Sequence, residues 1–135
     1  MQTANKNKFG RFEAESMIEL GKYWLMKGQA DMALVYFSRV EDHIYLAVDF
    51  VTKRELFLYT VAAKVSQFKN DPVVSNYYGI DLEDLRSELN ALIKILKPRG
   101  QTFILNRAIS LLCCIQSLLK ESPSSIRETM RQIST

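Results

Sequence analysis

Residues 16–40 carry small and bulky apolar side chains at spacings that suit two short antiparallel helices. A first helix over residues 12–27 is predicted because its apolar residues recur about every three or four positions. Gly28 suits the position just beyond that helix, since glycine adopts a left-handed conformation without a Cβ penalty. A second helix then starts near residue 29 or 30 and carries its own apolar stripe as far as residue 40.

Two small residues are expected to bring these helices together. Gly21 in the first helix and Ala33 in the second let the two backbones approach closely. Phe37 then covers the space beside Gly21, while Trp24 supplies bulk near the turn. The stretch is therefore interpreted as a tightly packed helical hairpin.

This pattern resembles a tetratricopeptide repeat over about residues 14–45. That family has a Leu-Gly pair, an aromatic residue, a glycine at the turn, a small alanine and a later aromatic residue. Those places are held here by Leu20, Gly21, Trp24, Gly28, Ala33 and Phe37. The chain departs from the family at Met17, Val40 and Tyr45, and no second copy is legible about 34 residues further on. The resemblance implies a helical hairpin in a protein that binds other proteins.

Low contents of glycine (5) and proline (3) among 135 residues favour helices over strands and turns. We therefore expect an all-α fold, a five- to six-helix bundle that includes the tetratricopeptide-like antiparallel helix hairpin. The chain length suits one domain. The expected organisation is a flexible basic tail over residues 1–10, followed by a single helical domain over residues 11–135.

The segment 29–70 contains neither glycine nor proline. As one helix it would be about 60 Å long, whereas a domain of this size has a radius of gyration near 14 Å. Breaks are therefore predicted near residues 41–42 and near residues 52–54. Residues 44–51 fit either a helix or a buried strand by composition.

Capping residues and prolines predict the later helix boundaries. A helix is expected to stop before Pro72, and Asp81 is expected to cap a helix over residues 82–96. Residues 98–100 form a turn before a largely apolar helix over residues 102–120. A last short helix begins at Ser122-Pro123. The sequence leaves open whether that helix docks on its own domain or only with a partner.

No arrangement of residues typical of catalysis or metal binding is present in the sequence. His43 is the only histidine, no serine lies in a nucleophile-elbow pattern, and the five glycines are isolated from one another. Cys113 and Cys114 are adjacent and suit small apolar core residues in a reducing compartment. We therefore expect a protein that is not an enzyme and uses no cofactor or metal.

The chain start and its most apolar segment argue for a cytoplasmic protein. Residues 1–11 are polar and basic, without the apolar core of a signal peptide. Residues 103–119 are too short for a membrane span and include Asn106 and Arg107. No membrane span is therefore expected.

The function predicted from these features is a non-enzymatic protein–protein interaction module, acting as an adaptor, scaffold or chaperone-like protein. It would hold a peptide or helix of a partner protein in a helical groove. Self-association through the same face is a variant, because one repeat does not cover its own apolar surface. The predicted partner-binding residues are Leu25, Met26, Met32, Tyr36, Tyr77 and Tyr78.

The alternative function is a small nucleic-acid-associated regulator. The net charge is +3, and the basic residues gather toward the two ends of the chain. Arg127 and Arg131 lie four residues apart and would contact phosphates from one helix face. The residues predicted for this alternative are Lys6, Lys8, Arg11, Arg127 and Arg131.

Overall fold

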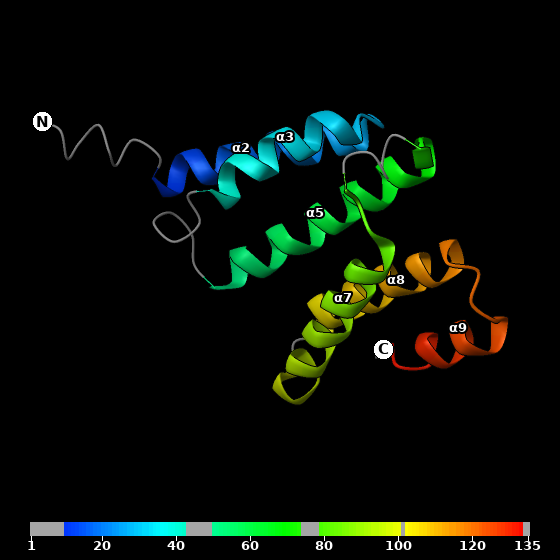
Figure 1. Cartoon of the computed structure of the whole chain (residues 1–135). Helices are drawn as coiled ribbons and strands as arrows, with labels where there is room; N and C mark the ends of the chain where they lie inside the picture. Colours follow the sequence, from blue (N-terminus) through cyan, green and yellow to red (C-terminus); the bar gives the residue numbers. More distant parts are fainter. Residues whose placement is uncertain (1–9, 43–49, 74–78, 101, 134–135) are drawn as a thin grey trace, which may run out of the picture. The chain divides into compact units, whose positions relative to one another are not determined.

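A computed structural model of the protein describes residues 10–42, 50–73, 79–100 and 102–133 (Figure 1). Six α-helices lie wholly within these ranges, and no strand occurs in them. The helices are α2 (Arg11–Met26), α3 (Ala30–Glu41), α5 (Phe50–Asn70), α7 (Leu82–Leu96), α8 (Thr102–Leu118) and α9 (Pro123–Met130), with a 3₁₀ turn η1 (Lys97–Arg99) after α7. The predicted all-α class is confirmed.

The chain forms two compact units, Met1–Gln67 and Phe68–Thr135. Antiparallel neighbours pack together within each unit, α2 with α3 in the first and α7 with α8 in the second (Figure 1). The expected single domain over residues 11–135 stays a prediction. The expected flexible tail over residues 1–10 lies outside the described residues, apart from Gly10.

Hydrogen bonds donated by backbone N–H groups define both ends of α2. At its start, the Gly10 N–H donates to Oε2 of Glu13 at 2.9 Å, which satisfies part of the exposed helix terminus. At its end, Gly28 has φ of +80° and its N–H donates to the Leu25 carbonyl at 3.1 Å. The Gln29 N–H donates to the Trp24 carbonyl at 2.9 Å. This pair of bonds is a Schellman motif, which uses the left-handed glycine as predicted.

The close crossing of α2 and α3 depends on Gly21 and Phe37. Gly21 is buried, and a Cβ atom added there would lie 2.8 Å from Cδ1 and 2.9 Å from Cζ of Phe37. Real Cβ atoms do not approach other carbons so closely. The Phe37 ring therefore occupies the space that Gly21 leaves, which confirms the packing predicted for this pair.

Residues 50–67 of α5 complete the core of the first unit, since the boundary between the two units falls inside this helix. Its Tyr59 ring stacks on Phe37, with ring centroids 6.3 Å apart and an interplanar angle of 27°. Leu56 and Ala63 lie on the same side of α5 and join the buried cluster. The buried members of this cluster are Ala14, Ile18, Ala33, Phe37, Val40, Leu56 and Ala63.

One predicted break in the long helical segment is wrong. Helix α3 ends at Glu41, as expected, but α5 runs without interruption through residues 52–54. Arg54 is only 8% exposed, so a charged residue occupies a buried position at the point where the apolar period of the sequence is interrupted. Of the segment that fitted either helix or strand, residues 50–51 are helical and residues 44–49 lie outside the described residues.

The second unit is built on leucine- and isoleucine-rich faces of α7 and α8. Asp81 caps α7, because its Oδ1 accepts a hydrogen bond from the Glu83 N–H at 2.9 Å. Ser122 caps α9 in the same way, with Oγ accepting from the Ser125 N–H at 3.2 Å. The buried apolar residues of the pair are Leu82, Leu85, Leu89, Ile93 and Leu96 on α7, and Leu105, Ala108, Ile109, Leu112 and Ile115 on α8.

The last helix docks on its own unit. Helix α9 packs against α8, and Thr129 is its buried residue. The Thr129 hydroxyl donates to the Ser125 carbonyl at 3.2 Å, so it is satisfied within the helix. Within the described residues, no helix combines the length and the apolar character needed to cross a membrane.

Candidate functional site

Five large side chains form a partly exposed apolar area on the α2–α3 hairpin. Residues three or four apart on a helix share a face. Met17, Leu20 and Trp24 follow this spacing on α2, and Met32 and Tyr36 follow it on α3. Leu20 is 45% exposed, and the other four side chains are half-buried. We call these five residues the hairpin surface.

The hairpin surface lies on the flank of the hairpin that turns away from α5. The flank toward α5 is identified by Lys22, whose ammonium nitrogen lies 5.0 Å from the centre of the Tyr59 ring. Phe37 of α3 stacks on the same ring. At 100° per residue, Leu20 and Trp24 project to the opposite side of α2 from Lys22. In an antiparallel pair the equivalent flank of α3 carries Met32 and Tyr36.

Trp24 is held in place by its neighbours. Its ring meets the Tyr23 ring edge to face, with centroids 5.4 Å apart and an interplanar angle of 78°. Nζ of Lys27 lies 5.5 Å from the centre of the Tyr23 ring. Trp24 also packs against the buried cluster of the first unit. It is therefore a fixed aromatic residue with part of its surface open, which is the character of a binding anchor.

The hairpin flank toward α5 carries a charged residue held by two partners. Lys22 Nζ donates to Oε1 of Glu19 at 3.1 Å while it lies over the Tyr59 ring. The hydrogen bond to Glu19 raises the pKa of the Lys22 ammonium group. On this side of the hairpin, Lys22 is therefore occupied by its contacts with Glu19 and with the Tyr59 ring of α5.

The predicted partner-binding residues occupy different environments. Met32 and Tyr36 belong to the hairpin surface, but Leu25 packs against the buried cluster and Met26 is 87% exposed at the end of α2. Tyr77 and Tyr78 lie outside the described residues. The structure thus brings Met32 and Tyr36 together, and their role in binding stays a prediction.

The structure describes three of the five residues that were predicted to bind nucleic acid, Arg11, Arg127 and Arg131. Lys6 and Lys8 lie outside the described residues, and Arg11 begins α2. Arg127 and Arg131 are both exposed on and beside α9. The guanidinium of Arg131 donates to Oε2 of Glu128 at 3.0 Å. His43 also lies outside the described residues.

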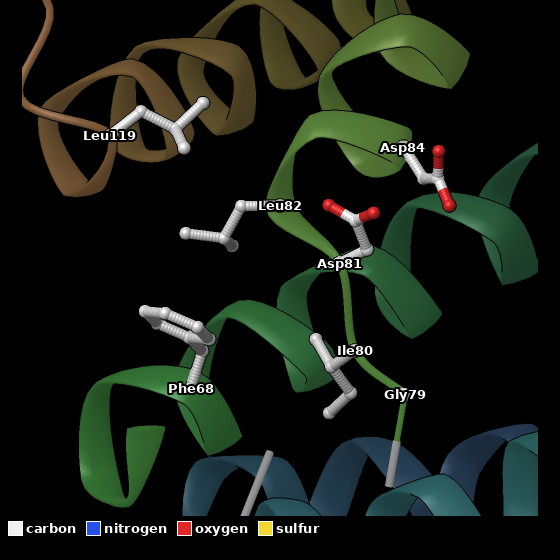
Figure 2. Close-up of a pocket in the computed structure, with 7 residues that line it drawn as sticks. All are labelled: Phe68, Gly79, Ile80, Asp81, Leu82, Asp84 and Leu119. Atoms are coloured by element: carbon white, nitrogen blue, oxygen red, sulfur yellow. The ribbon is translucent and has the colours of Figure 1, made fainter. Parts of the chain in front are cut away.

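A cavity of about 510 Å³ lies in the second unit, at the start of α7 (Figure 2). Figure 2 shows the side chains of Phe68, Leu82 and Leu119 directed toward the same space. The Asp81 carboxylate lies beside Leu82, and Asp84 lies in the first turn of α7. The described lining residues are Phe68, Gly79, Ile80, Asp81, Leu82, Asp84 and Leu119.

A polar network joins α7 to the segment between α8 and α9. Arg86 Nη1 donates to Oε2 of Glu121 at 2.7 Å, and Gln116 Nε2 donates to Oε1 of the same carboxylate at 3.4 Å. The hydrogen bond to Glu121 raises the pKa of the Arg86 guanidinium. Both carboxylate oxygens of Glu121 therefore accept hydrogen bonds within the chain, from Arg86 of α7 and Gln116 of α8.

The two cysteines are free thiols on α8. Cys113 is half-buried and Cys114 is exposed. Burial raises the pKa of the Cys113 thiol, so this residue is held as a neutral thiol near pH 7. Within the described part of the chain, no group of three or more histidine, cysteine or acidic side chains is arranged to hold a metal ion.

Sequence reasoning overlooked two features of these sites. It assigned Trp24 to the packing of the hairpin and treated Met17 and Leu20 only as positions of the repeat pattern, although the spacing of the three residues also indicates one apolar row on the helix. It explained Asp81 only as the cap of a helix. No local pattern places Phe68 beside residues of α7, so the cavity has no sequence signal.

Comparison of this chain with protein-family models, with curated proteins and with solved structures gave no match.

Proposed function

We propose that this chain is a protein-binding module whose hairpin surface holds a helix of a partner protein. The observation that carries the proposal is the set of five partly exposed apolar and aromatic side chains on one flank of α2 and α3. They come from both helices of the hairpin and repeat at helical spacing. A partner helix with apolar residues at the same spacing is the natural complement of two such rows.

The residue types support the proposal as much as their placement. Tryptophan and tyrosine are enriched among the residues that dominate binding energy at interfaces. Methionine adapts its shape to different partners because it is unbranched and flexible. Trp24 thus provides a fixed anchor, while Met17 and Met32 adjust around it. We interpret the hairpin as tetratricopeptide-like, in agreement with its Gly21–Phe37 crossing.

The proposed setting is an adaptor, scaffold or chaperone-like role in the cytoplasm, without enzymatic activity. The free thiols of Cys113 and Cys114 suit a reducing compartment, where unpaired cysteines are stable. Self-association through the hairpin surface is the variant in which the partner is a second copy of this chain.

The test is selection of binders from a library of displayed peptides with random amphipathic helical sequences. The proposal predicts that selected peptides carry apolar residues at positions i, i+3 or i+4, and i+7. Their affinities are then measured by fluorescence anisotropy. The double variant Met32→Ala, Tyr36→Ala should weaken binding at least about tenfold, which is the size of effect typical of interface anchors.

Ile95→Ala is the matched control for Leu20→Ala. Ile95 lies on α7 and is 46% exposed, against 45% for Leu20, so both variants remove a similar apolar surface. Leu20→Ala should weaken binding, and Ile95→Ala should leave it unchanged. Selected peptides without apolar periodicity, or equal effects of the two variants, would refute the proposal. Light scattering on the free protein shows whether the chain associates with a second copy of itself.

A further inference from the structure

We propose that the cavity in the second unit binds a small organic ammonium ion with an apolar body. This inference is independent of the function proposed for the hairpin surface, because every described residue that lines the cavity belongs to residues 68–135. The juxtaposition that carries it is an apolar floor with two carboxylates on one wall.

The floor is apolar and comes from separate parts of the second unit. Phe68 lies near the end of α5, Ile80 and Leu82 lie at the start of α7, and Leu119 follows α8. Leu82 is buried, whereas the other three are half-buried and keep part of their surface open to the cavity. Such a floor favours an aromatic or branched apolar group, because burying that group releases water from both surfaces.

The wall is negatively charged. Asp81 and Asp84 both line the cavity, and the described lining residues include no lysine or arginine. Asp81 uses Oδ1 to cap α7. Its negative charge and its second carboxylate oxygen remain able to interact with a cation. Two carboxylates outweigh the partial positive charge of a helix N-terminus, which is about half an elementary charge. A cation therefore complements this wall better than an anion or a neutral group.

The size of the cavity fits a small ligand. Pockets that bind small molecules usually measure about 300–1,000 Å³ and combine apolar walls with a few polar groups. A volume of about 510 Å³ lies within this range. The ammonium group would lie near Asp81 and Asp84, and the apolar body would lie against Phe68 and Leu119.

The test compares three probes that share a phenethyl group and differ in charge: phenethylammonium, phenethyl alcohol and hydrocinnamate. Binding to the full chain is followed by amide chemical shifts in two-dimensional NMR spectra. We expect phenethylammonium to bind with a dissociation constant in the millimolar range and to shift the amides around Ile80, Leu82 and Leu119. The alcohol should bind about tenfold more weakly, since it lacks two exposed ion pairs. Hydrocinnamate should bind more weakly still.

Two variants that each remove one carboxylate test which residues attract the ammonium group. Asp81→Asn keeps the cap of α7, because asparagine caps helices as well as aspartate does. Asp81→Asn and Asp84→Asn should each weaken phenethylammonium binding about two- to fivefold, and together they should abolish its advantage over the alcohol. Glu83→Gln is the matched control. It removes a charge from the same turn at a residue that does not line the cavity, so the affinity should stay within about twofold.

The floor is tested by Leu119→Ala, which should weaken both phenethylammonium and phenethyl alcohol. Equal binding of these two probes would overturn the proposal, as would unchanged binding by the double Asp variant. Shifts confined to α2 and α3 would also overturn it. The double variant Met32→Ala, Tyr36→Ala should leave probe binding unchanged, so failure of this proposal and failure of the proposed function are distinguishable.

Discussion

At Gly21, the usual effect of replacing glycine by alanine in a helix is expected to reverse. In an ordinary helix interior this change stabilises by about 1 kcal/mol. Here the added methyl group meets the Phe37 ring at less than contact distance. Overpacking of a closed core costs about 1–3 kcal/mol. After the helix-propensity gain is subtracted from this cost, Gly21→Ala should lower the free energy of unfolding by up to about 2 kcal/mol, measured by urea denaturation.

Two further variants control this prediction. Ser38→Ala changes an exposed position in α3 and should have little effect. In the Gly21→Ala background, Phe37→Leu should recover part of the loss, because leucine leaves room for the methyl group. An increase in stability for Gly21→Ala alone would show that the two helices separate easily at this crossing.

Lys120 is a second position where the backbone decides the effect of a substitution. It has φ of +60°, and the following Glu121 N–H donates to the Gln116 carbonyl at 3.0 Å in a Schellman motif that ends α8. A left-handed conformation is costly for any residue with a Cβ. Lys120→Gly should raise the free energy of unfolding by about 0.5 kcal/mol, since relief of strain exceeds the gain in unfolded-chain entropy.

Lys94 is the control position, where the same substitution by glycine is expected to destabilise the protein. It is exposed within α7, so Lys94→Gly should lower the free energy of unfolding by about 1 kcal/mol. Urea denaturation of both variants gives the comparison. Destabilisation by Lys120→Gly of similar size would contradict the strain assigned to this residue.

The adjacent cysteines should react at different rates. Cys114 is exposed, whereas Cys113 is half-buried and burial raises the pKa of its thiol. The thiolate is the reactive form, so at neutral pH iodoacetamide should modify Cys114 roughly tenfold faster. Mass spectrometry of the peptides over time measures both rates, and Cys114→Ser leaves only the slow reaction. Equal rates in the wild-type chain would refute this difference.

At the scale of elements, the ion pair between Arg86 and Glu121 should hold α7 against the segment that follows α8. Glu121→Gln should lower the melting temperature by a few degrees, because it also weakens the contact with Gln116. Added salt should shrink the difference, since the pair is partly exposed. Arg131→Gln breaks a pair that is about three-quarters exposed, so its melting temperature should equal that of wild type.

Helix ends were predictable where their causes are local. Asp81, Ser122 and Gly28 act through hydrogen bonds or dihedral angles within one turn, and the sequence indicates such caps directly. The continuity of α5 was not predictable, because Arg54 is charged yet buried. Periodicity treats a buried charge as an interruption, whereas Arg54 is 8% exposed in the folded chain.

At the scale of the molecule, the sequence predicted the hairpin but not which of its flanks stays open. That choice depends on where α5 packs, and α5 contacts the hairpin through Tyr59, Leu56 and Ala63. Leu25, which was predicted to face a groove, is half-buried and packs against the buried cluster as Trp24 does, and its role in binding stays a prediction. The cavity likewise depends on Phe68 and Leu119, which are distant in sequence and line the same space only in the folded chain.

The proposed role of the hairpin surface is tested most directly by photo-crosslinking from two positions in cell extract. A benzophenone side chain is placed at Leu20 or at Ile95, which are almost equally exposed. We predict a discrete protein adduct at Leu20 that resists nuclease, disappears in the Met32→Ala, Tyr36→Ala background and is absent at Ile95. Identical adducts at both positions, or a Leu20 adduct that the double variant leaves intact, would contradict binding through the hairpin surface.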